Sequence, residues 1–239
     1  MKTVVMNNSG NVGKTTICQN LLLPRLPESE VIRVETLNDD GDSTGEKLGA
    51  DDFDKIFETI LSSDDVIVDV GASNVEMFNY KLKNEFIGSH SFIDYFIIPV
   101  TPEEKQQRDT IETILMLLDM DVDADKIKVV FNRINPKKDI HSQFSTLIDS
   151  DKLELYNFKF DNIDVGINNA GLFDSLKKAD IEYSFIRDLS LAELEEKIQN
   201  EDDKKKISEL NILKFYKMGF DSYQSNLQAV FETLELKWF

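Results

Sequence analysis

The sequence predicts an α/β fold: a doubly wound, mostly parallel sheet with a helical C-terminal part. Short apolar, β-branched runs alternate with stretches of helical periodicity through residue 131, which is the pattern of strands joined by crossover helices. Polar residues of the kinds that bind ligands follow these runs, at the edge where parallel sheets hold their ligands. We expect residues 1–239 to form one domain, of which residues 185–239 are the helical C-terminal part.

The chain is acidic and carries one cysteine. Lys and Arg number 27 against 45 Asp and Glu, a net charge of −18. This balance argues against broad binding to nucleic-acid phosphates, so direct DNA binding is disfavoured. Cys18 alone cannot form an intrachain disulfide. The first residues lack the pattern of a signal peptide, and no apolar run approaches the roughly 20 residues that cross a bilayer. We therefore expect a cytoplasmic protein without a membrane interaction.

Residues 8–16, Asn-Ser-Gly-Asn-Val-Gly-Lys-Thr-Thr, predict a phosphate-binding loop. They lie between an apolar strand at residues 4–6 and a helix at residues 15–23. Backbone N–H groups at such a turn bind phosphate oxygens, and the helix dipole helps them. The pattern is G-x-x-x-x-G-K-[ST], except that Asn8, which tolerates positive φ, replaces the first glycine. An ordinary glycine-containing turn is the alternative.

Each position of this loop has an expected role. Gly10 and Gly13 give the backbone conformations that a residue with a Cβ resists. Lys14 places its ammonium on the β- and γ-phosphates, and the Thr15 hydroxyl completes the coordination of Mg²⁺. The loop residues expected to bind the nucleotide are Gly10, Asn11, Val12, Gly13, Lys14, Thr15 and Thr16.

The next elements lead to two acidic positions. A strand at residues 31–34 runs into the turn 35–42, whose carboxylates either face a metal or a water molecule or belong to a solvated loop. A core-facing helical stripe occupies residues 53–61. The run 66–71 predicts a buried strand that carries one carboxylate, Asp69. That carboxylate would hold Mg²⁺ or its water if this strand lies beside the phosphate loop.

The rest of the chain continues the alternation and then becomes helical. A strand at residues 96–100 precedes a helix that Thr101 caps and Pro102 opens. A further strand at residues 127–131 ends in Asn132. Beyond it we expect strand-like patches at 153–160, a helix at 173–179, and helical stretches at 189–198, 207–216 and 227–236.

The chain resembles the deviant Walker-A ATPases of the ParA/MinD type over roughly residues 1–185. The segments that carry the resemblance are 9–16, 31–35, 66–73 and 96–103, followed by Asn132-Arg133. Residues 6–16 look most similar to the StbB-type plasmid stability proteins associated with conjugative plasmids. The resemblance implies a P-loop NTPase fold with ATP and Mg²⁺ as ligands. It also implies a nucleotide-dependent homodimer and a partner protein from a plasmid partition or conjugation system.

By position, the resemblance assigns roles to individual residues. Lys14 and Thr15 become the phosphate and magnesium residues, Asp69 the second-strand aspartate at the metal, and Gly71 part of the second switch. Asn132 becomes the residue that reads adenine. An amide can both accept from and donate to adenine, whereas the four residues that start at Asn132 lack the lysine and aspartate of the guanine-selective N-K-x-D motif. ATP is therefore expected over GTP.

Two departures from the family pattern concern hydrolysis. The family's signature lysine falls at Ser9, and a hydroxyl cannot supply that charge. The second aspartate of the family's D-x-D motif, which positions the attacking water, falls at Leu37, and only a shift of one or two residues substitutes Asn38 or Asp39. With Lys14 and Asp39 as the expected catalytic residues, we expect a weak ATPase.

Three functions remain open. The first is an ATP-dependent switch in plasmid stability, partition or conjugation, which changes partners as γ-phosphate contacts order or release its switch loops. The second is an ATP-binding scaffold or dimerisation protein that does not hydrolyse, which the two departures favour. The third is a small-molecule enzyme on the same phosphate loop, for which the sequence offers no dedicated substrate constellation.

An apolar helical face near the C-terminus comprises Leu227, Val230, Phe231, Leu234 and Trp238. The polar face of the same helix carries Glu232, Glu235 and a single Lys237, whereas helices that lie on anionic bilayers usually carry several lysines and arginines there. We expect this face to pack on the core or on a partner subunit rather than on a membrane.

Overall fold

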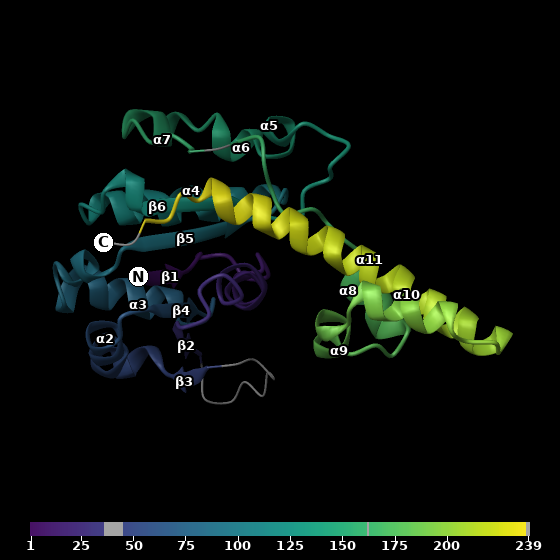
Figure 1. Ribbon diagram of the computed structural model, residues 1–239. Coiled ribbons are helices and arrows are strands. Elements are labelled where there is room, and N and C mark those ends of the chain that lie inside the picture. Colours follow the sequence, from purple (N-terminus) through teal and green to yellow (C-terminus); the bar gives the residue numbers. More distant parts are fainter. Residues whose placement is uncertain (36–44, 162, 238–239) are drawn as a thin grey trace.

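A six-stranded, all-parallel sheet forms the centre of the computed structural model, which describes residues 1–35, 45–161 and 163–237 (Figure 1). The strands lie in the order β3-β2-β4-β1-β5-β6. Their bounds are Lys2–Val5 (β1), Glu30–Val34 (β2), Glu46–Leu48 (β3), Val66–Val70 (β4), Tyr95–Val100 (β5) and Ile127–Phe131 (β6). The predicted parallel sheet is confirmed, although β3 was not predicted.

Helices connect the strands and continue after the last one. Before β6 these are α1 (Lys14–Thr16), the π-helical η1 (Ile17–Leu22), η2 (Ala50–Asp52), α2 (Phe53–Ser62), α3 (Val75–Tyr80), η3 (Lys81–Glu85), η4 (Ser89–Phe92), α4 (Glu104–Asp119) and η5 (Ala124–Lys126). After β6 they are α5 (Ile140–Gln143), α6 (Ser145–Ile148), α7 (Asp151–Leu155), α8 (Leu172–Lys178), α9 (Tyr183–Asp188), α10 (Leu191–Gln199) and α11 (Lys204–Thr233). The helix predicted at residues 15–23 is present, and its second part is wound as a π-helix.

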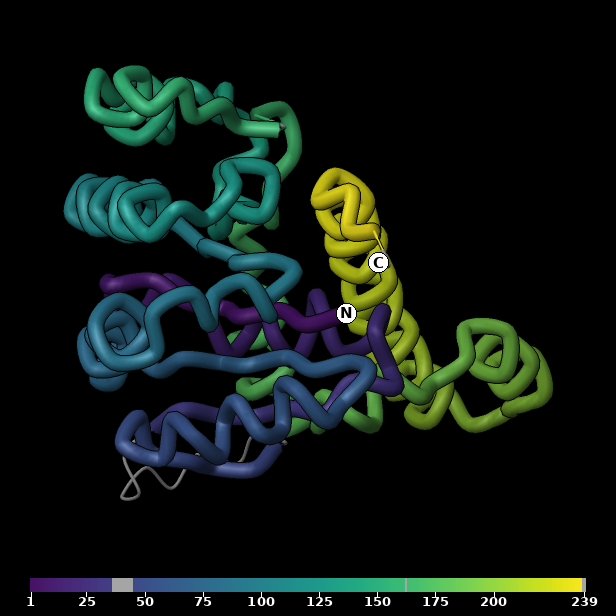
Figure 2. The backbone as a smooth tube through the Cα atoms, turned by 90° about the vertical axis from the view of Figure 1, so that its left-hand side faces the viewer, coloured from purple at the N-terminus to yellow at the C-terminus, as the bar shows by residue number. Residues whose placement is uncertain are grey.

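Helices cover both faces of the sheet, so the sheet is doubly wound as predicted. Successive side chains of a strand point to opposite faces, and they enter two separate cores. One core joins Val4 and Val68 to helices α2, α3 and α4. The other joins Val5 and Ile67 to η1 and α11. Figure 2 shows α11 on one side of the sheet and α2, α3 and α4 on the other.

Two predicted elements differ from the structure near the middle of the chain. Residues 153–160 were predicted as strand-like, but they begin inside helix α7, where Leu153 packs into the core. A helix of little more than one turn shows too few apolar positions to reveal its period. Helix α4 begins at Glu104 rather than directly after Thr101, with Glu103 at the N-cap position, and the Thr101 hydroxyl donates to the Gln106 side chain.

The C-terminal part is helical as predicted. One continuous helix, α11, contains residues 207–216 and most of 227–236, which were predicted as separate stretches. Leu227, Val230 and Leu234 are buried in the core on the η1 side of the sheet, so the prediction that this face packs on the core is confirmed. Trp238 lies outside the described residues. Of the helices that the structure describes, none has the length and hydropathy needed to cross a membrane.

The first half of α11 belongs to an arm, which we define as α8, α9, α10 and residues 204–222 of α11 (Figure 1). A small core of its own contains Leu176, Ile186 and Phe220. Further along α11, the Asn226 side chain donates to the carbonyl of Gly166. The next residue in the chain, Ile167, donates its N–H to the carbonyl of Phe131 at the end of β6. The backbone N–H of Lys237 donates to the Tyr95 hydroxyl at the start of β5. Helix α11 therefore runs antiparallel to the strands, and the arm lies beyond their carboxyl ends.

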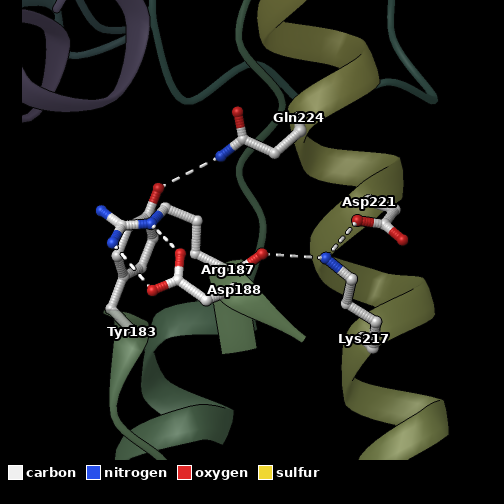
Figure 3. A network of polar contacts seen from close by, with 6 residues as sticks. All are labelled: Tyr183, Arg187, Asp188, Lys217, Asp221 and Gln224. Carbon is white, nitrogen blue, oxygen red and sulfur yellow. Dashed lines mark hydrogen bonds and ion pairs between the residues drawn. The ribbon is translucent and has the colours of Figure 1, made fainter. Parts of the chain in front are cut away.

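A polar network fastens α9 to α11 in the arm (Figure 3). The buried Lys217 ammonium donates to the carbonyl oxygen of Arg187 at 3.2 Å and pairs with the Asp221 carboxylate at 3.0 Å. The Gln224 amide donates to the Tyr183 hydroxyl at 3.1 Å, and burial raises the pKa of that tyrosine. These contacts compensate the buried lysine charge and direct the polar groups of this part of α11 toward α9.

Candidate functional site

The loop after β1 contains two left-handed backbone positions. The φ angle is 57° at Asn11 and 92° at Gly13. A Cβ on Gly13 would lie 2.5 Å from the Asn132 side-chain nitrogen, so this position requires glycine. Gly10 lies outside the left-handed region, and a Cβ there would meet its nearest neighbour at an ordinary 3.8 Å. Asn8 has no positive φ either. The conformational freedom predicted for Gly10 and Asn8 is therefore used at Asn11 instead.

Buried polar side chains of α4 hold this loop in place. The Asn7 amide donates to the Thr110 hydroxyl at 2.7 Å, and its carbonyl oxygen accepts from the Ser9 N–H at 2.8 Å. The Thr113 hydroxyl accepts from the Asn8 N–H at 3.1 Å. These supports were not predicted. The available signal is that Thr110 and Thr113 occupy buried positions within the apolar stripe of α4.

The Lys14 ammonium lies inside the curve of the loop. The residue is 7% exposed, and Nζ donates to the carbonyl oxygens of Asn7 at 3.2 Å and Ser9 at 2.9 Å. Burial lowers the pKa of Lys14, and the nearby Asp69 carboxylate acts in the opposite direction. Because both carbonyls are neutral, a phosphate oxygen would offer this ammonium a stronger, charge-assisted partner.

Asp69 lies beside the loop, as predicted. Strand β4 pairs with β1, and Asp69 stands opposite Val5, the last residue of β1. Asp69 is 1% exposed, and neither carboxylate oxygen makes a hydrogen bond of ordinary geometry to another described residue. Burial raises the pKa of Asp69, whereas the neighbouring Thr15 hydroxyl and Lys14 ammonium favour its ionised form.

This carboxylate suits a divalent cation. A buried carboxylate whose hydrogen bonds are incomplete costs on the order of several kcal/mol, and a hard cation that prefers oxygen ligands lowers that cost. In the part of the chain that the structure describes, no group of three or more His, Cys, Asp or Glu side chains is arranged to hold a metal ion. Mg²⁺ fits such a sparse donor set, because it usually keeps waters and phosphate oxygens beside one or two protein ligands. Thr15 and Asp69 therefore fit Mg²⁺.

A pocket of about 360 Å³ opens over the loop. It is lined by Asn11, Val12, Gly13, Lys14, Thr15, Thr16, Glu35, Gly71, Ala72, Ser73 and Arg133. Six of the seven predicted loop residues are thus together at one cavity, of a size that suits a small molecule. Gly10, Asp69 and Asn132 do not line it. Asp69 and Asn132 nevertheless adjoin residues that do, namely Lys14 and Gly13.

Glu35 brings a carboxylate to this pocket from the end of β2. It is 8% exposed and pairs with the Arg33 guanidinium at 2.6 Å. Glu35 begins the turn 35–42, whose carboxylates were predicted either to face a metal or a water molecule or to belong to a solvated loop, and Glu35 itself was not singled out as a site residue. Asp39, the predicted catalytic carboxylate, lies outside the described residues, as do Leu37 and Asn38, so these assignments stay predictions.

Asn132 supports the loop from the end of β6. Its Nδ2 donates to the Val12 carbonyl at 2.8 Å, and its Oδ1 accepts from the Arg133 N–H at 2.9 Å. The amide is thus engaged with the loop, and its role in reading adenine stays a prediction. Arg133, which was not predicted as a site residue, has a φ of 56° and donates to the Asn11 side chain at 3.2 Å.

Neither family models nor curated proteins match this sequence. Among solved structures, the chain is similar to MinD from Aquifex aeolicus at 19% identity and a TM-score of 0.47, over 79% of this chain and 89% of MinD. It is similar to an ATP complex of a McdA variant from Cyanothece at 13% identity and a TM-score of 0.48, over 100% and 98%. It is also similar to a Borrelia burgdorferi protein described as a plasmid partition protein and bound to AMPPNP, at 14% identity and a TM-score of 0.48, over 97% and 98%. Identities and TM-scores this low leave the assignment of function to the residues of the site.

Proposed function

We propose that the chain is an ATP-binding, slowly hydrolysing switch protein of the ParA/MinD type that acts in plasmid stability, partition or conjugation. The observation that carries the proposal is the buried Lys14 ammonium within a glycine loop, next to the buried Asp69 carboxylate. The loop and its lysine suit the phosphates, and the carboxylate suits the metal ion that accompanies them. The resemblance of the sequence segments to ParA/MinD ATPases supports the more specific part of the proposal.

Binding would start at the loop. Its backbone N–H groups would hold phosphate oxygens, and Lys14 would exchange the carbonyls of Asn7 and Ser9 for the β- and γ-phosphates. Thr15 and Asp69 would hold Mg²⁺, which neutralises phosphate charge when bound. On this proposal Asn132 selects ATP over GTP through its amide.

Two segments at the pocket would report the nucleotide state. One is Glu35 at the end of β2, and the other is residues 71–73. They adjoin each other, because the Gly71 N–H donates to the carbonyl of Val34, the residue before Glu35, at 2.9 Å. A Cβ on Gly71 would also meet the Glu35 Cγ at 3.2 Å. Contacts with the γ-phosphate would order both segments, and hydrolysis would release them.

On this proposal Lys14 and Asp39 are the catalytic residues, and hydrolysis is slow because a positive charge is missing from the site. The position of the family's signature lysine is Ser9, which is 5% exposed and carries no charge, so less transition-state charge is stabilised. The same observation favours a second candidate function, an ATP-binding scaffold that does not hydrolyse.

The proposal includes partners and a place of action. We propose a cytoplasmic protein of one domain that forms a homodimer when nucleotide is bound and works with a partner protein of a plasmid partition or conjugation system. The acidic composition disfavours direct DNA binding.

Calorimetric titration with ATP, ADP and GTP, each with and without Mg²⁺, tests the nucleotide site. We expect Mg²⁺-dependent ATP binding that Lys14→Ala abolishes, because the substitution removes the ammonium inside the loop. Lys55→Ala is the matched control, since this α2 side chain is 60% exposed, and it should bind ATP as the unmodified protein does. Unaltered affinity in Lys14→Ala would sink the site assignment. Phosphate release under the same conditions supports the switch, and binding without phosphate release supports the scaffold.

A further inference from the structure

The outward face of α11 carries few charges over residues 210–229, a stretch that begins in the arm and continues beyond it. Between residues 210 and 229, every exposed residue is uncharged, although charged residues make up 30% of the chain. The charged side chains of this stretch are held in ion pairs: Lys214 pairs with Glu195 of α10 at 2.7 Å, and the buried Lys217 pairs at 3.0 Å with Asp221, whose side chain is 42% exposed (Figure 3). A surface helix normally presents its charges to water, so this face indicates a contact surface.

Three large apolar side chains form a ridge on this face. Ile212 is 52% exposed, Phe215 72% and Met218 55%. Their spacing of three residues keeps them on one side of the helix. Gly219 and Ser222 are exposed on the same side, and their small size lets a second helix approach closely. The ridge, Ile212, Phe215 and Met218, thus has the shape of one half of a helix–helix contact.

We propose that the ridge pairs with the ridge of a second copy of this chain, in an antiparallel crossing centred on Phe215. Ile212 and Met218 lie three residues on either side of Phe215. A two-fold axis at Phe215 therefore sets each Ile212 against the partner's Met218, so the same surface serves both copies. A self-complementary pattern of this kind needs no other protein to cover it.

Charge favours the antiparallel direction and argues against an anionic bilayer as the occupant. The exposed Lys204, Lys205 and Lys206 begin α11, and parallel pairing would set them against the same lysines of the partner. Antiparallel pairing sets Lys205 against the partner's Ser225, because both lie ten residues from Phe215. Two chains with a net charge of −18 repel each other, and this neutral face adds no like charges to that repulsion. An anionic bilayer would require lysines along the face rather than only at its end.

This contact goes beyond the proposed function and is independent of nucleotide. No residue of the ridge lines the pocket over the phosphate loop. We therefore expect the pairing in nucleotide-free protein and in Lys14→Ala, where a nucleotide-dependent dimer does not form. A failure of the arm contact leaves the nucleotide proposal untouched, and a failure of nucleotide binding leaves the arm contact untouched.

Sedimentation velocity of the nucleotide-free full chain over a concentration series tests the contact. We expect a reversible dimer, and we expect Phe215→Asp to raise its Kd by at least about tenfold, which is about 1.4 kcal/mol, because it sets two carboxylates against each other. Leu155→Asp is the matched control, since Leu155 of α7 is 83% exposed, and its Kd should be unchanged. A dimer that Phe215→Asp leaves intact overturns the proposal.

Cysteine cross-linking gives an independent readout. Cys18 is the only natural cysteine and is 2% exposed, so an introduced cysteine reports its own surroundings. Phe215→Cys lies on the proposed axis and should form an intermolecular disulfide on mild oxidation much faster than Leu155→Cys. Equal rates for the two variants, together with a monomer at every concentration, would assign the ridge to a different protein and overturn the proposal.

Discussion

Replacing Asp69 by asparagine tests two consequences of its buried charge: a lower free energy of unfolding without metal, and the binding of Mg²⁺ with ATP. Within the described residues, this carboxylate is 1% exposed and has no hydrogen bond of ordinary geometry, so its ionised form destabilises the metal-free fold. Asparagine keeps the shape and removes the charge, but its amide also stays poorly satisfied. We expect Asp69→Asn to increase the free energy of unfolding of the metal-free protein by about 1–3 kcal/mol. For a chain of this size, each kcal/mol corresponds to about 2–4 °C in Tm.

The pH dependence follows from the raised pKa of Asp69. Burial sets this pKa above its unfolded value, so the folded protein binds the proton more tightly than the unfolded chain between the two pKa values. Stability of the unmodified protein therefore falls as pH rises through that window. Below the unfolded pKa both states are protonated and the penalty is absent, and above the folded pKa it is complete. The stability advantage of Asp69→Asn should accordingly grow from acidic toward neutral pH.

Urea denaturation at several pH values, with thermal melts in the presence and absence of Mg²⁺ and ATP, measures this effect. Mg²⁺ with ATP should stabilise the unmodified protein and stabilise Asp69→Asn much less, because the variant lacks the metal-binding carboxylate. Asp54→Asn changes an exposed carboxylate of α2 and is the control. It should have the stability of the unmodified protein in metal-free buffer, and Mg²⁺ with ATP should stabilise it as much as the unmodified protein. The reasoning is refuted if Asp69→Asn is less stable than the unmodified protein in metal-free buffer at neutral pH, or if nucleotide stabilises both equally.

Two further predictions concern the loop. Gly13→Ala should lower the free energy of unfolding by about 1–3 kcal/mol and weaken ATP binding, because a Cβ at a φ of 92° would lie 2.5 Å from the Asn132 amide. Gly10→Ala should change either quantity little, and denaturation and calorimetry of both variants check the contrast. Asn132→Ala should weaken ATP binding by releasing the Val12 carbonyl, and it should narrow the preference for ATP over GTP. An unmodified protein that binds both nucleotides equally well would contradict the second expectation.

The sheet was predictable where its strands are buried on both faces. Every residue of β4 and β5 is buried, so both appear in the sequence as continuous apolar runs. Strand β3 has three residues, of which Glu46 and Lys47 are charged, and it exists through its pairing with β2. Helix α7 is also short, with five residues. Such elements depend on tertiary contacts, which no local period records.

The site was predictable only in part for a related reason. Backbone phosphate binding needs small residues and a lysine at fixed spacing, so the loop is visible in the sequence. The groups that hold the loop come from distant segments: Asn7 and Thr110 are 103 residues apart, and Asn132 and Val12 are 120 apart. Arg133 could not be predicted for the same reason, because its contact at the pocket is with Asn11, 122 residues away in the sequence.

Asn132 shows how one residue type can suit two tasks. An amide at the end of a strand can read a base or support a loop, because it both donates and accepts. The structure sets its nitrogen 2.8 Å from the Val12 carbonyl and within 2.5 Å of the place that a Cβ on Gly13 would occupy. Asn132 therefore requires glycine at position 13, since a side chain there would displace the Asn132 amide. The phosphate end of the pocket and the end of β6 form one packed unit, so the two proposed roles of Asn132 cannot be tested by affinity for ATP alone and need the comparison between ATP and GTP.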